Sequence, residues 1–222
     1  MKSKLISIIF TAAVLSLVES CFAQGFTNLD FEHAKIAAGP GGFGILTSNA
    51  IPGWTAYIGG TPQSVIFNDG VTLGGAMVSL QDTNAVFVGP AIQGNFSVLL
   101  SGGGSTYNPP SDQFSAFIGQ TGTIPTTAKT LTFWGNVGGM QLTFNGQPIS
   151  FIDISNTLNY AIWVADISAY AGQAGQLLFT TPVNTGALLD NIQFSSIPVP
   201  EPSMFALTSL GALFLGFCRR RR

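Results

Sequence analysis

The chain has 222 residues, of which 46% are hydrophobic and 8% charged, and its formal net charge at pH 7 is −2. Residues 24–198 hold two lysines and no arginine against eight acidic residues, a net charge of −6, which disfavours a nucleic acid partner. Both cysteines, Cys21 and Cys218, lie outside this region, so it has no thiol for a disulfide, a nucleophile or a thiolate metal site.

The first 23 residues have the pattern of an export signal. Lys2 and Lys4 precede an apolar stretch over residues 5–18, and Ala23 ends a short segment that suits signal cleavage. We therefore predict a signal peptide over residues 1–23, which the export machinery cleaves between Ala23 and Gln24. The alternative is a lipoprotein acylated at Cys21, but Glu19 fits that pattern poorly.

Residues 24–197 are predicted to form an all-β ectodomain. They are rich in Phe, Val, Ile, Thr and Gly, and short apolar or alternating runs recur between turn residues. We predict a two-sheet antiparallel β-sandwich with jelly-roll topology, and keep a lipocalin-like barrel as the alternative. The candidate strands are residues 27–32, 54–58, 64–67, 76–80, 85–88, 96–101, 113–120, 129–135, 140–144, 149–154, 161–166, 176–181 and 188–194.

One hairpin can be predicted in detail. Asn145-Gly146 offers two positions that tolerate positive φ, as a type I′ turn requires, and it places Ile149 opposite Leu142. Because Pro148 cannot donate to a β-ladder, the outgoing strand is expected at a sheet edge. Farther along the chain, residues 167–171 are expected to form one helical turn.

Three short motifs mark the beginning and the end of the ectodomain. They are Asn28-Leu29-Asp30-Phe31-Glu32, Pro52-Gly53-Trp54 and Leu188-Leu189-Asp190-Asn191-Ile192. With these motifs the ectodomain resembles jelly-roll carbohydrate-binding modules and galactose-binding-like domains. The resemblance implies that the first and last strands lie close together, and that Glu32 and Asp190 hold a structural Ca²⁺, the one cofactor we expect.

Carboxylate oxygens are suitable ligands for a hard cation such as Ca²⁺, which also requires further oxygens from the backbone. Asp30 shares strand parity with Glu32, so it either contributes to the site or points to water. The alternative interpretation is that Glu32 and Asp190 are solvated acids at strand ends.

Aromatic side chains supply the candidate ligand-binding residues, because their faces suit the apolar C–H faces of sugar rings. Trp54 follows Pro52-Gly53 at a strand start, Tyr57 lies three residues on, and Tyr107 sits in a Gly/Ser/Asn/Pro-rich stretch. For Trp54 the alternative is a packed plug at the end of the sandwich. Trp134 and Trp163 lie inside strong strand patterns and are expected in the core.

No residue is predicted to be catalytic. His33 is the only histidine, no serine has a G-x-S-x-G setting, and the spacing of the aspartates singles out no pair for glycoside hydrolysis. The glycine-rich stretch 39–44 lacks the Lys-Ser/Thr pair of a phosphate-binding loop, so we interpret it as an ordinary loop. We therefore predict a protein that is not an enzyme, with a glycan or ester hydrolase as the less favoured alternative.

The C-terminal residues 198–222 have three consecutive parts. Pro200-Glu201-Pro202 is followed by an apolar stretch over residues 204–217 and then by Arg219, Arg220, Arg221 and Arg222. A helix over residues 202–218 would be about 25 Å long, slightly shorter than a hydrocarbon core of about 30 Å. The arginines are expected on the cytoplasmic side, with the ectodomain outside.

This ending resembles the PEP-CTERM sorting signal of Gram-negative bacteria. The resemblance implies that an exosortase, a membrane protease-transpeptidase, recognises and removes it after the helix has held the protein in the inner membrane; the alternative is a simple tail anchor. We therefore expect an exported, non-catalytic protein of the cell surface or extracellular matrix, with polysaccharide as its ligand. A self-associating structural protein without a small ligand is the alternative.

Overall fold

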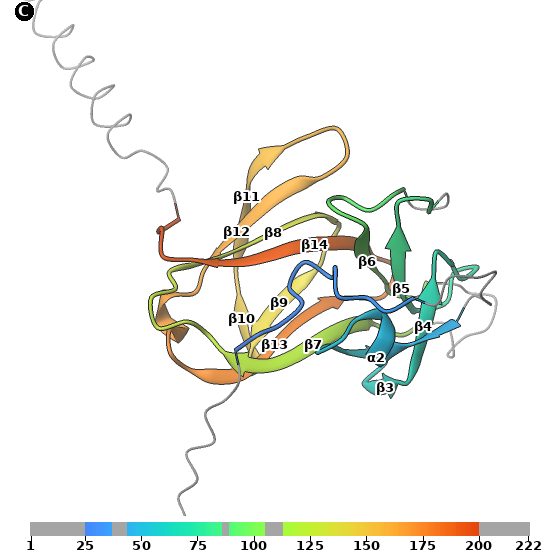
Figure 1. The fold of residues 1–222 in the computed structure, drawn as a ribbon, viewed down its shortest axis with the longest axis horizontal. Coiled ribbons are helices and arrows are strands. Elements are labelled where there is room, and N and C mark those ends of the chain that lie inside the picture. Colours follow the sequence, from blue (N-terminus) through green and yellow to red (C-terminus); the bar gives the residue numbers. More distant parts are fainter. Residues whose placement is uncertain (1–24, 37–43, 86–88, 105–112, 200–222) are drawn as a thin grey trace, which may run out of the picture.

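The computed structural model describes residues 25–36, 44–85, 89–104 and 113–199, which form two packed β-sheets (Figure 1). The eight-stranded sheet has the order β1 (Gly44–Leu46), β4 (Val65–Asn68), β5 (Met77–Asp82), β6 (Phe96–Ser101), β14 (Gly186–Ser195), β8 (Thr130–Val137), β12 (Ala161–Asp166) and β11 (Phe151–Asn156). The six-stranded sheet has the order β10 (Gln147–Ile149), β9 (Gln141–Phe144), β13 (Ala174–Thr181), β7 (Ala116–Thr123), β2 (Thr55–Ile58) and β3 (Thr61–Gln63). A short helix, α2 (Thr47–Ala50), and a 3₁₀ turn, η1 (Ser168–Tyr170), complete the described elements.

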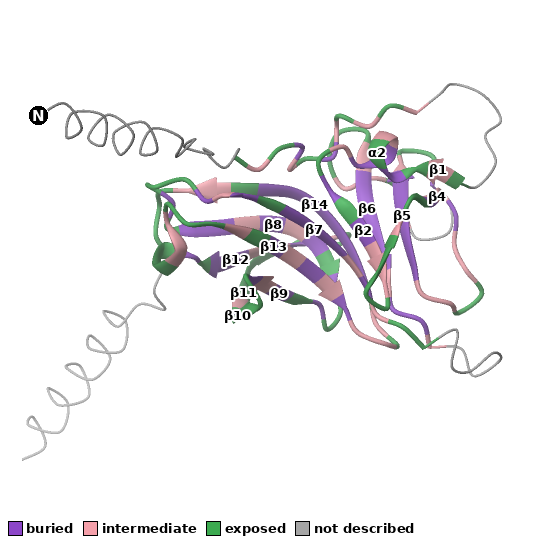
Figure 2. Cartoon of the chain, turned by 90° about the horizontal axis from the view of Figure 1, so that it is seen from below, coloured by how far each residue is buried: buried purple, intermediate pink, exposed green. Residues whose placement is uncertain are grey.

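The core lies between the two sheets, because alternate side chains of each strand point inward. Leu177 and Phe179 of β13 face Leu131 and Phe133 of β8, and all four are fully or almost fully buried. The Phe133 and Phe179 rings meet edge to face with their centroids 5.5 Å apart. Figure 2 shows the alternation of buried and more exposed residues along these strands.

The predicted two-sheet sandwich is confirmed, with one difference in strand direction. All strand pairs are antiparallel except β4 and β5, which run parallel and pair Phe67 with Ser79 and Asn68 with Leu80. The eight-stranded sheet is therefore mixed. The sequence could not reveal this pair, because a two-residue ladder leaves no pattern of its own.

The first predicted strand, residues 27–32, is wrong. Asn28 and Phe31 have φ of 50° and 58°, which breaks the extended backbone, and the segment forms turns instead. It nevertheless lies beside the last strand, as the resemblance implied, since the Ile192 amide donates to the Leu29 carbonyl at 2.9 Å.

The predicted strand over residues 149–154 is two strands in different sheets. Ile149 ends β10 in the six-stranded sheet, whereas Phe151 begins β11 in the eight-stranded sheet by pairing with Ala165. The chain therefore crosses from one sheet to the other at Ser150. The short elements β1, β3 and α2 were not predicted, and the predicted strand at residues 85–88 falls largely outside the described residues.

The predicted hairpin is confirmed. Asn145 and Gly146 have φ of 50° and 76°, Leu142 pairs with Ile149, and the strand that contains Pro148 is an edge strand. The 3₁₀ turn η1 falls inside the predicted helical turn.

Both terminal signals are largely outside the described residues. The structure does not describe the predicted signal peptide over residues 1–23 or the part of the C-terminal segment from residue 200 onward. Among the residues that it does describe, no helix has the length and apolar character needed to cross a membrane.

Candidate functional site

Glu32 holds a loop that follows β5. Its Oε1 accepts hydrogen bonds from the backbone amides of Asn95 and Phe96 at 2.8 and 3.0 Å, and its Oε2 accepts one from Asn95 Nδ2 at 2.9 Å. Gly94 has a φ of 62°, and a Cβ at this position would overlap the Glu32 carboxylate. Glycine at position 94 therefore allows the carboxylate to lie directly against the loop backbone.

Asp190 also binds this part of the chain. Its Oδ2 accepts hydrogen bonds from the Gln93 amide and the Ser97 hydroxyl, both at 2.9 Å, and its Oδ1 accepts one from the Asn191 amide at 2.6 Å. The side chain is 1% exposed. Two carboxylates from opposite ends of the ectodomain thus hold residues 93–97, and we call Glu32 and Asp190 the carboxylate clasp.

The clasp residues border one small pocket of about 110 Å³, together with Asp30, Gln93, Gly94 and Asn191. Burial raises the pKa of Asp190 to about 6; hydrogen bonds from Gln93, Ser97 and Asn191 oppose this rise, and the nearby charge of Glu32 adds to it. Sequence reasoning brought Glu32 and Asp190 together correctly, but it missed the loop that both carboxylates bind. No local pattern in residues 93–97 announces these partners.

The clasp is not by itself a recognisable metal centre. Within residues 25–36, 44–85, 89–104 and 113–199 no group of three or more His, Cys, Asp or Glu side chains is arranged to hold a metal ion. The donor oxygens are nevertheless of the kind that Ca²⁺ prefers, and from the described residues Glu32 Oε2 and Asp190 Oδ1 each accept one hydrogen bond.

Trp54 lies in the core at one end of the sandwich. It is 4% exposed, its Nε1 donates to the Asn28 carbonyl at 3.0 Å, and its ring contacts Phe31 and Phe179 at centroid distances of 5.8 and 6.2 Å. This placement favours the packed-plug alternative, because neither face of the ring is open to a ligand. The third aromatic candidate, Tyr107, lies outside the described residues.

Tyr57 lies on the outer face of the six-stranded sheet, half-buried. It pairs across strands with Phe117, and the two rings stack with their centroids 4.8 Å apart and their planes 14° from parallel. The row continues across the sheet, since Phe117 pairs with Thr180 and Thr180 with Gln141. We call Tyr57, Phe117, Thr180 and Gln141 the aromatic row.

The aromatic row belongs to a neutral surface. None of the residues in the six strands of this sheet, all of which the structure describes, is charged. Beside the row, the same outer face presents Gln176, Thr121 and Thr143, whose amide and hydroxyl groups can donate and accept hydrogen bonds. Sequence reasoning missed Phe117, Thr180 and Gln141, because only the register of four strands aligns them with Tyr57.

Trp134 is not in the core as predicted. It lies half-buried on the outer face of the eight-stranded sheet, where its ring stacks on Tyr160 at a centroid distance of 5.1 Å and an angle of 7°. The strand alternation could have revealed this, because Leu131 and Phe133 face the core and Trp134 has the opposite parity. Trp163 packs against the core as expected, and its Nε1 donates to the Gly135 carbonyl at 3.0 Å.

Comparisons with known proteins identify the C-terminus. A family model described as the PEP-CTERM protein-sorting motif matches residues 198–222, which confirms the resemblance of this segment. Such a motif marks an exported protein that is processed at a membrane by an exosortase. No curated protein matches the chain.

Two solved structures resemble the chain at low identity. "TmCBM61 in complex with beta-1,4-galactotriose" is 12% identical with a TM-score of 0.41, over 78% of this chain and 99% of that one. The enzymatically active domain of tailspike protein 4 of bacteriophage CBA120 is 15% identical with a TM-score of 0.37, over 73% of this chain and 21% of that one. At these TM-scores neither structure bears on the ligand or the activity of this chain.

Proposed function

We propose that this chain, which carries a PEP-CTERM sorting motif at residues 198–222, is an exported, non-catalytic protein that binds neutral polysaccharide. The observation that carries the proposal is the aromatic row, a stacked pair of rings on a sheet whose described strands contain no charged residue. The ligand would lie along the outer face of the six-stranded sheet, across β2, β7, β13 and β9.

The chemistry of the aromatic row suits sugars better than ionic ligands. Pyranose rings offer apolar C–H faces that pack on aromatic rings, and their hydroxyls exchange hydrogen bonds with amides and hydroxyls such as those of Gln141 and Thr180. A charged ligand would find no opposite charge on these strands to replace its hydration. Tyr57 and Phe117 are both partly exposed, so part of the surface of the stacked pair is open to solvent.

The arrangement of the carboxylates supports the proposal that the protein is not an enzyme. Asp190 has a raised pKa and lies near Glu32, the combination that a glycosidase needs, but both side chains already accept three hydrogen bonds each. Their pocket of about 110 Å³ is also well below the roughly 300 Å³ at which ligand pockets begin.

A structural Ca²⁺ is part of the proposal. It would lie in the pocket beside the clasp, with Glu32 Oε2 and Asp190 Oδ1 as its carboxylate ligands and Asp30 as a third candidate. The ion would neutralise two negative charges held close together. If it binds, the melting temperature rises on adding Ca²⁺ and falls with a chelator, and the response is weaker in Glu32→Gln. An unchanged response in Glu32→Gln would remove this assignment.

The routing of the protein follows from its two ends. Cleavage between Ala23 and Gln24 would release the ectodomain on the outer side of the inner membrane of a Gram-negative bacterium. The apolar stretch would hold the chain there, with Arg219 to Arg222 on the cytoplasmic side, until an exosortase acts near Pro200-Glu201-Pro202. The released protein would then join the cell surface or the extracellular matrix.

Retention on polysaccharide tests the binding. We expect the purified protein to be slowed in gels that contain the cell's own exopolysaccharide, and Tyr57→Ala and Phe117→Ala to weaken this retention about tenfold. Tyr170→Ala is the matched control, because Tyr170 also packs one ring against a phenylalanine, Phe144, but at a different place. Equal losses in all three variants, or no retention of the parent protein, would refute the proposal.

A second candidate function is self-association, and the edge strand β11 favours it. β11 has six residues, no proline, and two isoleucines, Ile152 and Ile154, that are about half exposed. By contrast, the edges of the six-stranded sheet are three-residue strands that each contain a proline, Pro62 and Pro148. Edge strands that are longer and lack proline tend to pair with other strands, and in β11 only Asp153 and the register shift between Asp153 and Ser155 oppose this.

Sedimentation velocity over a range of concentrations distinguishes the two candidates. Self-association through β11 predicts oligomers that Ile154→Lys disrupts, whereas the polysaccharide-binding proposal is indifferent to this variant. A monomer at every concentration would rule out assembly through this edge.

A further inference from the structure

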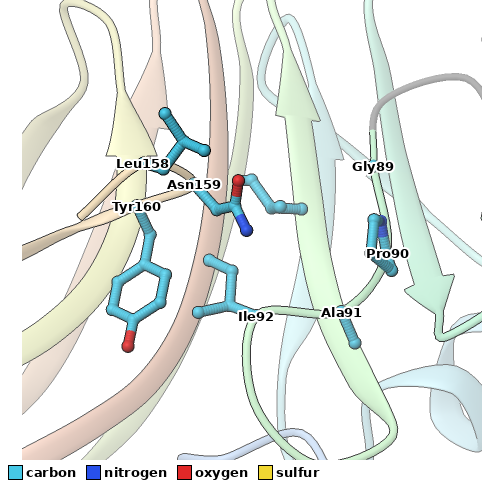
Figure 3. A pocket seen from close by; sticks show the side chains of 8 residues that line it. Gly89, Pro90, Ala91, Ile92, Leu158, Asn159 and Tyr160 are labelled. Carbon is cyan, nitrogen blue, oxygen red and sulfur yellow. The ribbon is translucent and has the colours of Figure 1, made fainter.

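A second pocket lies on the opposite sheet, far from the aromatic row in the fold. Figure 3 shows it between two chain segments that approach over the outer face of β14. Pro90 and Ile92 form one side, Leu158, Asn159 and Tyr160 of the β11–β12 hairpin form the other, and Leu188 of β14 forms the floor. Its volume is about 320 Å³, which reaches the lower end of the range for small-molecule sites.

The hairpin side of the pocket is rigidly held. Tyr160 stacks almost parallel on Trp134, so one face of its ring is fixed by another aromatic ring. Its backbone is closed on Thr157, because the Thr157 amide donates to the Tyr160 carbonyl at 2.9 Å and the Tyr160 amide donates to Thr157 Oγ1 at 3.0 Å. A pocket wall that is fixed before binding loses little entropy when a ligand arrives.

The opposite side is also held, by polar groups beneath it. The Ile92 amide donates to Ser97 Oγ at 2.8 Å, and the Ala91 amide donates to the Asp82 carbonyl at 3.1 Å. The next residue, Gln93, is bound by Asp190 of the carboxylate clasp. The clasp therefore positions the loop that forms this wall.

The lining combines apolar surface with uncharged polar groups. None of the described residues around the pocket carries a charge. Leu158 is 100% exposed at the rim, where its side chain has no cover from the rest of the described chain. In Figure 3 the amide of Asn159 lies between Leu158 and Ile92, where it can donate and accept hydrogen bonds.

We infer that this pocket binds the terminal residue or terminal disaccharide of a neutral glycan. An anionic ligand would lose its hydration without meeting a cation, and a purely aliphatic ligand would make no use of the hydrogen-bonding groups of Asn159. A sugar ring suits both the apolar and the polar parts of the lining, since its C–H face can lie on Tyr160 and Leu158 while its hydroxyls bond to Asn159. This site goes beyond the proposed function, because it uses different residues on the other sheet.

Titration calorimetry with free sugars tests the inference on the full chain. The probes are neutral monosaccharides and disaccharides, namely galactose, glucose, N-acetylglucosamine, galactobiose and cellobiose, with glucuronic acid as the charged comparison. We expect at least one neutral probe to bind at millimolar concentration or better, and glucuronic acid to bind more weakly than glucose. No heat with any neutral probe, or tighter binding of glucuronic acid, would overturn the inference.

Variants connect the binding to this pocket. Tyr160→Ala and Asn159→Ala should each raise the Kd about tenfold, and Asn159 is exposed in a hairpin turn, so its replacement leaves the fold intact even if Tyr160→Ala does not. Tyr170→Ala is the matched control: it removes an aromatic contact with Phe144 elsewhere in the fold and should leave the Kd for free sugars unchanged. Unchanged affinity in Asn159→Ala, Tyr160→Ala and Leu158→Ala would mean that the sugars bind elsewhere.

Failure of this site and failure of the aromatic row give different results. If only the row binds, Tyr57→Ala abolishes both polysaccharide retention and free-sugar binding, which contradicts the inference. If only the pocket binds, free-sugar binding survives Tyr57→Ala and polysaccharide retention depends on Tyr160, which supports the inference while it removes the proposed role of the row.

Discussion

The carboxylate clasp makes the stability of this protein depend on pH in an unusual direction. Burial raises the pKa of Asp190 from its ordinary value of 3.8 to about 6, so the folded protein holds a proton that the unfolded chain releases. The stabilisation of the fold that comes from this proton on Asp190 is complete below pH 3.8 and is lost as the pH rises to about 6. The free energy of unfolding should therefore fall over this interval.

The magnitude follows from the size of the rise in pKa. A rise from 3.8 to about 6, at roughly 1.4 kcal/mol for each pKa unit, corresponds to about 3 kcal/mol. The ionisable groups that border the same pocket as Asp190 are Glu32 and Asp30. Both are carboxylates, so within the described pocket no positive charge opposes the rise in the pKa of Asp190. An Asp190→Asn variant has no proton to lose at this position and should lack most of this fall.

The assay is urea unfolding of the parent protein and Asp190→Asn at several pH values between 4 and 7, with a chelator present. The absolute stability of the variant is not the test, since an amide cannot accept both the Gln93 and Ser97 hydrogen bonds through its nitrogen. The test is whether the free energy of unfolding changes with pH more steeply in the parent protein than in Asp190→Asn. Parallel curves for the two proteins would refute the reasoning.

Calcium should reverse the dependence of the free energy of unfolding on pH. A bound cation favours the ionised carboxylates, so at saturating Ca²⁺ the parent protein should become more stable as the pH rises from 4 to 7. If the slope is the same with Ca²⁺ and with chelator, the clasp works without a metal ion.

Three further results are expected. Phe179→Ala should cost about 3–5 kcal/mol in chemical denaturation, because the ring is fully buried between Trp54 and Phe133, whereas Leu178→Ala on the outer face of the same strand should cost much less. Gly146→Ala should cost about 1 kcal/mol, since φ of 76° strains any residue with a Cβ; a neutral Gly146→Ala would contradict the type I′ turn. Removing residues 198–222 should abolish the membrane-bound intermediate seen by cell fractionation, and an unchanged membrane fraction would mean that another segment anchors the chain.

Several features of the fold were predictable because they depend on local sequence. The two-residue period of apolar side chains placed most strands, and Asn145-Gly146 fixed a turn and its register. The proximity of Glu32 and Asp190 was predicted from the resemblance of the terminal motifs to jelly-roll carbohydrate-binding modules. The structure brings the two carboxylates into one pocket, although the segment that carries Glu32 is not a strand.

Other features depend on residues far apart in the chain. Asn28 and Phe31 adopt positive φ because their segment bonds to Trp54 and lies against β14, which no pattern within residues 27–32 encodes. Likewise, the run 149–154 has a continuous apolar character, but it divides between two sheets because its halves pair with different partners.

The sequence by itself determined the all-β class and the PEP-CTERM motif at the C-terminus, since strand alternation, turn residues and a sorting motif are all local patterns. Only the tertiary structure decided which side chains meet. Tyr57 and Phe117 are sixty positions apart, and only the register between β2 and β7 stacks their rings. The alternation of apolar and polar side chains along a strand shows that its two faces differ, but the pairing of strands decides which side chains lie together on each face.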